Sequence, residues 1–220
     1  MTVRNRFERQ LESLHLDIIK MGAMIERAIE DAFRALTTGN EELSRSVIES
    51  ESAVDDMAGR VEAQALSLLL RQHPVAGDLR AITTALKIVG DMERISDQAR
   101  DISEINLYLM KQDYKPKWEK IPKMADLTKR MVNMSVDAYV TQNQSLADEV
   151  IELDDKVDEQ FELMKADMIA LLQNNSEHAD AAIYLMMIAK YFEKIGDHAE
   201  NIAEWVQFSL TGVRKHKRLL

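Results

Sequence analysis

Four pairs of carboxylates, each with its members four residues apart, stand at matching positions in the two halves of this 220-residue sequence, and each pair falls on one face of a helix. Like charges placed in this way repel each other, more strongly when they are partly removed from water. Water, a neighbouring Arg or Lys, or a metal cation held between two helices could offset the repulsion. Oxygen-only clusters suit hard cations such as Mg²⁺, Mn²⁺ or iron, so the pattern indicates metal binding. The pairs are Glu51 and Asp55, Glu93 and Asp97, Asp154 and Asp158, and Glu193 and Asp197.

The carboxylate pairs belong to a duplicated sequence. The segment ERISD at 93–97 returns as EKIGD at 193–197, and VIESESAVDD at 47–56 returns as VIELDDKVDE at 150–159. Each pair continues a line of apolar residues along its helix, where a further apolar residue is expected. A single pair would most simply be a solvated acidic face, but matching pairs in both halves favour a shared cation.

Basic side chains could supply that positive charge in place of a metal. Arg94 and Lys194 directly follow an acid, and we expect them to point away, about 100° round the helix. Lys87 and Lys190 lie nearer to the carboxylate lines. If they form buried ion pairs, the clusters are structural and hold no metal. The basic residues considered are Arg94, Lys194, Lys190, Lys87 and Lys165.

Long helices must position these acids. The whole chain contains only seven Gly and three Pro, which predicts an all-α protein. Apolar residues recurring every three or four positions predict helices at about 3–36, 41–72, 78–111, 124–139, 146–173 and 179–210. The stretch QDYKPKWEKIPK interrupts this period. We therefore expect two tandem homologous antiparallel three-helix bundles, at 1–112 and 123–220, with a linker at 113–122.

Composition narrows the classes of partner. A net charge of −10 argues against nucleic-acid binding, which relies on Lys and Arg at phosphates. The absence of Cys excludes disulfides and thiolate metal ligands. The first residues lack the apolar core of a signal peptide, and no uncharged stretch approaches the ~20 residues of a membrane span. We expect a soluble, cytoplasmic protein without direct membrane insertion.

The sequence resembles the PhoU family over nearly its whole length. The resemblance rests on ERISD at 93–97, EKIGD at 193–197, GDLR at 77–80 and the acidic pairs of the other two helices. It implies a non-enzymatic, usually dimeric protein of the cytoplasm that restrains phosphate import and helps to repress phosphate-starvation genes. The implied partners are the ATPase of the phosphate ABC transporter and a membrane sensor histidine kinase.

The resemblance also implies carboxylate metal sites, with iron, zinc, manganese or magnesium as the ion. Asn201 stands where the first half has Asp101, so the second site is expected to have one anionic ligand fewer and a smaller metal complement. Ser96 and Lys194 replace the usual glycine and arginine of the family motif. The residues to which the metal role falls are Glu51, Asp55, Glu93, Asp97 and Asp101 in the first half, and Asp154, Asp158, Glu193 and Asp197 in the second.

Two other functions remain open. A di-iron carboxylate oxidase unrelated to phosphate would use Glu-x-x-His on two helices, whereas this sequence offers one such pair, Glu12 and His15, which we expect on a helix surface. His198 follows Asp197 and is expected to project to a different face. Alternatively, the chain is a metal-binding or purely structural helical scaffold whose acidic faces contact a basic partner. Elemental analysis of protein purified without chelator would distinguish these possibilities.

Overall fold

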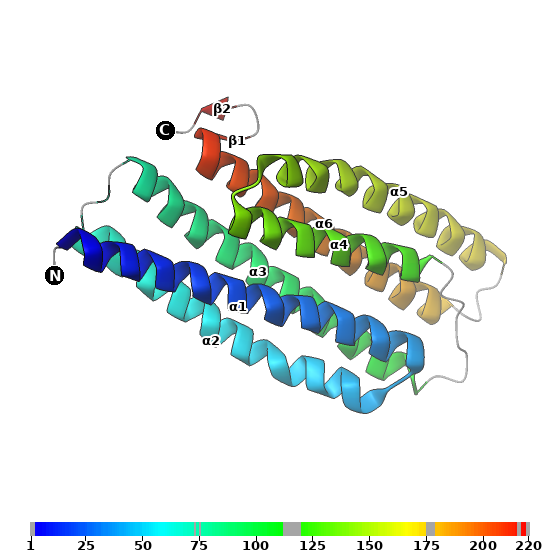
Figure 1. Cartoon of the computed structure of the whole chain (residues 1–220). Helices are drawn as coiled ribbons and strands as arrows, with labels where there is room; N and C mark the ends of the chain where they lie inside the picture. The colour runs from blue at the N-terminus through cyan, green and yellow to red at the C-terminus, as the bar shows by residue number, and fades with distance from the viewer. Residues whose placement is uncertain are drawn as a thin grey trace.

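The computed structural model describes residues 3–72, 74, 76–111, 120–174, 179–214 and 217–218. Within them, six helices run along a common long axis, with the first three on one side and the last three on the other (Figure 1). The prediction of an all-α protein built from two tandem antiparallel three-helix bundles is confirmed. Most of the expected linker at 113–122 lies outside the described residues. The helices are α1 (Val3–Thr38), α2 (Glu41–Gln72), α3 (Ala76–Leu109), α4 (Ile121–Thr141), α5 (Gln144–Asn174) and α6 (Ala179–Thr211).

A short antiparallel ladder follows α6. It consists of β1 (Val213–Arg214) and β2 (Lys217–Arg218), in which Val213 pairs with Arg218 and Arg214 with Lys217. Periodicity could not predict strands of two residues, because two positions do not establish an alternating pattern. None of the helices in the described ranges has an apolar stretch of the length required to cross a bilayer.

The duplication extends to the turns that reverse the chain within each half. Gly39 and Gln142, with φ values of 63° and 51°, occupy the left-handed conformation that ends a helix. Asn40 and Asn143 follow, and their side-chain oxygens accept hydrogen bonds from the backbone N–H three residues on, at 3.0 and 3.2 Å. These caps begin the next helix at once. The turns therefore hold α1 against α2 and α4 against α5 as antiparallel neighbours.

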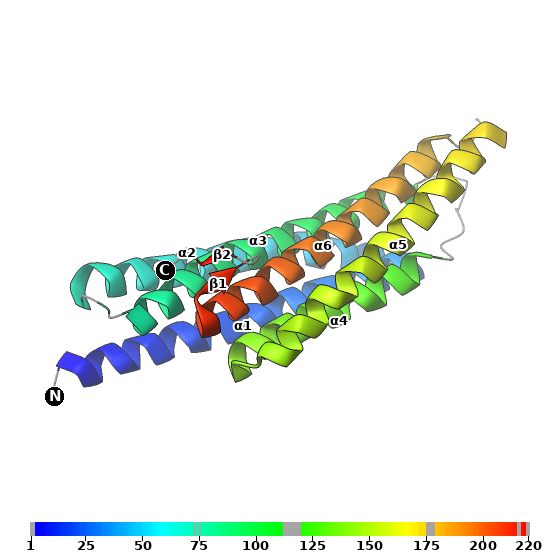
Figure 2. The same cartoon turned by 90° about the horizontal axis from the view of Figure 1, so that it is seen from above.

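The two halves share one core. The central helices α3 and α6 pack against each other, α2 and α5 flank them, and α1 and α4 contact each other as well as their own bundles (Figure 2). Met92 and Ile95 of α3, together with Phe192 and Ile195 of α6, are completely buried. Because these residues alternate with the acids along α3 and α6, the core fixes the direction in which the acids point.

The contact between α1 and α4 contains a polar pair that joins the halves. His15 Nδ1 lies 2.5 Å from Tyr139 Oη, and the Tyr139 side chain is only 2% exposed. Burial lowers the pKa of His15 and raises the pKa of Tyr139. The expectation that His15 lies on a free helix surface was wrong, because α4 covers that part of α1. The contact with Tyr139 engages one ring nitrogen of His15, Nδ1.

The His15 contact predicts a pH dependence of stability. The unfolded chain protonates His15 near its ordinary pKa of 6.5, whereas the folded protein takes up the proton only at lower pH. Unfolding therefore binds a proton between these two pKa values, and the contribution of His15 to stability, complete above about 6.5, is lost as pH falls. In urea unfolding between pH 5 and 8, the stability of wild type relative to His15→Gln should fall on acidification, while the raised pKa of Asp154 acts in the opposite direction equally in both proteins. Equal slopes for both proteins would contradict this prediction.

Candidate metal centre

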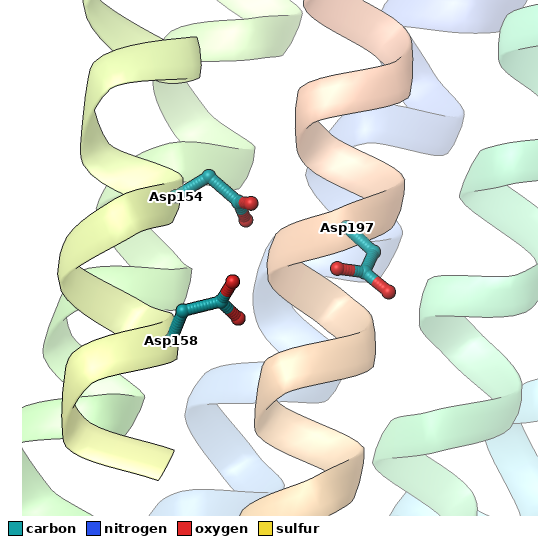
Figure 3. Close-up of side chains that lie close together, drawn as sticks. All are labelled: Asp154, Asp158 and Asp197. Atoms are coloured by element: carbon teal, nitrogen blue, oxygen red, sulfur yellow. The ribbon is translucent and has the colours of Figure 1, made fainter. Parts of the chain in front are cut away.

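The second half brings three predicted residues together across one seam. Asp154 and Asp158 project from α5 toward α6, which carries Asp197 (Figure 3). One carboxylate oxygen from each residue lies within 4.8 Å of those of the other two. Asp154 and Asp158 share a face because they are one helical turn apart. We call these three residues, with Glu193, the second-half cluster.

The second-half cluster is short of positive charge on its α5 side. Asp154 Oδ1 is buried and has no hydrogen-bond partner among the described residues. Burial, followed by the charges of Glu200, Asp158, Asp197 and Glu193, raises the pKa of Asp154 to about 7. Burial, followed by the charges of Glu193 and Asp197, also raises the pKa of Asp158. The folded protein therefore holds carboxylates that would be stabilised by a bound cation.

The spacing of these oxygens fits a metal ion. Two oxygen ligands on opposite sides of an ion that binds at about 2.1–2.5 Å lie roughly 4–5 Å apart. The 4.8 Å limit on the distances among the Asp154, Asp158 and Asp197 oxygens falls in that range. The donors are all carboxylates, which favours hard cations over soft ones. An orphaned buried oxygen, suitable spacing and suitable donors together indicate that the residues can hold an ion.

Two lysines lie at the edge of the second-half cluster. Lys190 Nζ is 2.6 Å from Glu193 Oε1, as expected from its position near the acidic line. Lys194 pairs with Asp197 and lies 3.5 Å from Glu193 Oε2. The expectation that Lys194 points away was wrong, because residues three apart along a helix are neighbours on its surface. Both lysine side chains are at least 40% exposed, and both pair with acids of their own helix.

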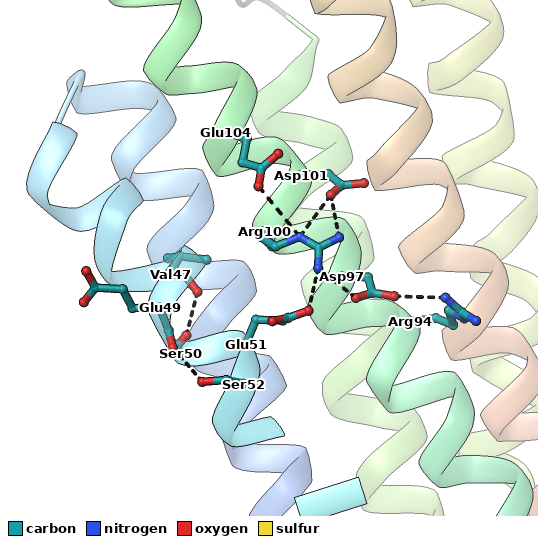
Figure 4. A network of polar contacts seen from close by, with 10 residues as sticks. All are labelled: Val47, Glu49, Ser50, Glu51, Ser52, Arg94, Asp97, Arg100, Asp101 and Glu104. Atoms are coloured by element: carbon teal, nitrogen blue, oxygen red, sulfur yellow. Dashed lines mark hydrogen bonds and ion pairs between the residues drawn. The ribbon is translucent and has the colours of Figure 1, made fainter. Parts of the chain in front are cut away.

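The first half arranges its acids around an arginine. Arg100 of α3 donates from Nη1 to Glu51 of α2 at 2.5 Å and from Nη2 to Asp101 at 3.0 Å (Figure 4). Its Nη1 also lies 3.4 Å from Asp97 Oδ1. Arg94 donates to Asp97 Oδ2 at 3.1 Å, so the expectation that this side chain points away was wrong, for the same helical reason as at Lys194. The guanidinium of Arg100 thus joins three of the predicted ligands.

Two further acids of the first half lie in the same electrostatic environment. Burial, followed by the charge of Asp55, raises the pKa values of both Glu51 and Glu93. These effects place Asp55 close enough to influence both α2 and α3. The predicted first-half residues are therefore gathered at the α2–α3 seam, as the sequence indicated. We call Glu51, Asp55, Glu93, Asp97 and Asp101 the first-half cluster.

Asn201 does not join the second-half cluster through its side-chain oxygen. Its Oδ1 accepts a hydrogen bond from Arg214 Nη2 at 3.0 Å, and the same nitrogen pairs with Glu204 at 3.0 Å. The guanidinium of Arg214 also lies 4.0 Å from the centre of the Trp205 ring. Asn201 therefore connects α6 to β1. The residue that replaces Asp101 in the second half has a hydrogen bond to Arg214 as its observed contact.

The other basic residues and His198 have separate partners. Lys87 lies over the ring of Trp205 at 5.8 Å, and Lys165 is paired with Glu162 on its own helix at 2.6 Å. His198 Nδ1 is 2.9 Å from Asp91 Oδ1 on α3, so it faces away from Asp197 as expected. This contact links the two halves.

Sequence reasoning missed two residues at the clusters. Arg100 sits among the first-half acids, and Glu200 stands at the equivalent place in α6, close enough for its charge to raise the pKa of Asp154. Both lie three residues after an aspartate of the repeated motif, Asp97 or Asp197. A search for neighbours at three as well as four residues would have found them.

The whole chain is similar to a set of curated proteins. A family model described as the PhoU domain matches residues 18–105 and 121–206. The phosphate-specific transport system accessory protein PhoU homolog of Clostridium acetobutylicum is 33% identical over 210 residues, covering 95% of this chain and 96% of that protein. The PhoU homolog 1 of Thermotoga maritima is 32% identical and covers 94% of this chain and 89% of its own.

Solved structures show the same fold. The crystal structure of PhoU from Pseudomonas aeruginosa superimposes with a TM-score of 0.92 at 26% identity, covering 94% of this chain and all of that one. The phosphate transport system regulatory protein PhoU from Streptococcus pneumoniae gives a TM-score of 0.88 at 21% identity, which supports the fold alone.

Proposed function

This chain belongs to the PhoU family, and from that membership we propose that it is a non-enzymatic accessory regulator of phosphate transport. The observation that carries the proposal is the similarity, over nearly the full length of both chains, to proteins named as phosphate-specific transport system accessory proteins. The match covers both halves of the fold, so the proposed role belongs to the two-bundle protein as a unit.

The proposed partners are the ATPase of the phosphate ABC transporter and a sensor histidine kinase. The chain would act in the cytoplasm as a homodimer, restraining import and repressing phosphate-starvation genes when phosphate is plentiful. The two packed three-helix bundles suit this role, because a surface built on packed helices keeps its shape when a partner docks. The boundaries proposed for the two units are 1–112 and 123–220.

We further propose that the second-half cluster holds a metal ion, with iron, manganese, zinc or magnesium as candidates. Asp154 and Asp158 would bind it from α5, and Asp197 and Glu193 from α6. The ion would supply positive charge that neutralises the carboxylates and a bond network that ties the two helices together. In support, the cluster combines suitable spacing with a buried oxygen that has no hydrogen-bond partner within the described ranges.

A binding experiment tests the regulatory role. The immobilised chain should retain the purified transporter ATPase in phosphate-replete buffer, and deletion of its gene should raise phosphate uptake in rich medium. The cognate sensor kinase provides a second binding assay. An unrelated helical protein of similar negative charge serves as control for non-specific retention. Failure to bind either component at any phosphate concentration, together with unchanged uptake in the deletion strain, would exclude the proposed function.

A further inference from the structure

The two clusters differ in the sign of one charge at a matched position. ERISD and EKIGD align α3 with α6 at a constant separation of 100 residues, which makes Arg100 the counterpart of Glu200. The acids around this position are conserved between the halves at 93 and 193 and at 97 and 197. The exchange therefore places a cation in one cluster and an additional anion beside the other.

The Arg100 guanidinium contacts three of the five acids of the first-half cluster. It reaches Glu51 on α2 at 2.5 Å and Asp101 on α3 at 3.0 Å, with Asp97 at 3.4 Å (Figure 4). A guanidinium offers several N–H donors in a fixed plane and stays charged at every physiological pH. It therefore supplies between two helices the positive charge that a bridging metal ion would otherwise provide.

The second half contains no equivalent internal cation among the described residues. Lys190 and Lys194 form their ion pairs with Glu193 and Asp197 of their own helix. Lys190 also lies 4.9 Å from the centre of the Phe161 ring of α5, and its charge acts on Asp158, but within the described residues neither lysine forms an ion pair with an acid of α5. Asp154 Oδ1 is buried and has no hydrogen-bond partner in the part of the chain that the structure describes. A bound ion is stabilised most by carboxylates that no side chain already pairs, and among the described acids of the second-half cluster these are Asp154 and Asp158.

The backbone of α6 comes close to Asp154 at the second-half cluster. A Cβ added to Gly196 would lie 3.2 Å from Asp154 Oδ1. The first half carries Ser96 at the matching position, with 2% of its surface exposed, and uses the longer Glu51 opposite it. The glycine thus lets the short Asp154 side chain come close to α6, while the first-half seam is filled by Ser96 and spanned by Arg100.

From these observations we propose that Arg100 is a built-in substitute for metal in the first-half cluster, and that the Arg100 and Glu200 exchange confines metal binding to the second half. The inference rests on the proposed function, in which the carboxylates of the second-half cluster hold a metal ion. The two duplicated sites are then unequal. Arg100 neutralises the first-half cluster, whereas the second-half cluster takes its positive charge from a metal ion in solution.

Equilibrium dialysis of the full-length protein against Mn²⁺ alone tests this assignment, with free Mn²⁺ counted by electron paramagnetic resonance. Arg100→Gln should bind more Mn²⁺ per chain than wild type, and adding Glu51→Gln should remove the gain. Glu200→Arg should bind less than wild type. Arg45→Gln, which removes a 58% exposed arginine paired with Glu41 on α2 and outside both clusters, is the matched control and should bind the wild-type amount. Circular dichroism melts of each variant establish that it is folded.

The outcomes separate the inference from the proposal on which it rests. If wild type binds Mn²⁺ at the second half and Arg100→Gln gains none, the role of Arg100 is overturned while the metal site stands. If wild type binds none and Arg100→Gln binds Mn²⁺ in a Glu51-dependent manner, the second-half site fails and the role of Arg100 stands. Binding in wild type that Glu51→Gln reduces, or no binding by any of the folded proteins, overturns the inference.

Discussion

Replacing Asp154 and Asp158 together by Asn is expected to weaken Mn²⁺ binding by ~100-fold or more, because two of the anionic ligands lose their charge. The same change should stabilise the metal-free protein by roughly 1–2 kcal/mol, after allowance for solvent screening of these partly exposed groups. The stabilisation follows from the raised pKa of Asp154, which shows that folding disfavours its ionised form. Isothermal titration calorimetry and urea unfolding in chelator measure the two effects.

A matched control variant distinguishes the loss of two cluster ligands from the loss of two negative charges elsewhere on α5. Glu152→Gln with Glu159→Gln removes two charges from exposed positions on the same helix, α5. This control should keep wild-type affinity for Mn²⁺ and change stability by no more than about 0.5 kcal/mol. Equal loss of affinity in the control and in the Asp154 and Asp158 double variant would show that general negative charge, and not the second-half cluster, attracts the ion.

Gly22→Leu is expected to destabilise the protein by about 2–3 kcal/mol through overpacking between the halves. Gly22 is buried in α1, and a Cβ placed there would lie 2.8 Å from Val136 Cγ1 of α4. The larger side chain must push α1 and α4 apart or force Val136 out of its preferred rotamer. Both responses loosen the contact that contains His15 and Tyr139. Denaturant unfolding followed by circular dichroism gives the change in stability.

Two further variants test the cause of that destabilisation. Gly59 is exposed in α2 and has no atom within 4 Å of its built Cβ, so Gly59→Leu should stabilise the protein by about 0.5–1 kcal/mol through helix propensity. Adding Val136→Ala to Gly22→Leu should recover part of the loss, although Val136→Ala alone is destabilising. Strictly additive effects of Gly22→Leu and Val136→Ala would rule out the proposed steric contact.

The helices and the gathering of the acids were predictable from the sequence for a simple physical reason. Burial of one face imposes a period of 3.6 residues, and acids that share that period must share the face. The repeat then brings the acids of α2 and α3, and those of α5 and α6, to equivalent seams. The ends of the helices were less predictable. The helices α3 and α4 begin at Ala76 and Ile121, whereas the sequence predicted that they begin at about residues 78 and 124.

The partners of individual side chains were less accessible to sequence reasoning. Long side chains such as Arg94 and Lys194 reach three residues along their own helix, and the direction of the Cα–Cβ bond alone does not reveal this. The contact between His15 and Tyr139 joins residues 124 positions apart, so it depends on how the two bundles pack. The place of Arg100 in the first-half cluster was missed for both reasons, because this side chain contacts Asp101 of its own helix and Glu51 of α2.

Crystals of the wild-type chain soaked in Mn²⁺ and measured for anomalous scattering would locate bound ions directly. The anomalous map should contain density between Asp154, Asp158 and Asp197, with none among Glu51, Asp97 and Asp101. Density confined to the first half, or at neither seam in protein that retains both sets of carboxylates, would contradict metal binding by the second-half cluster.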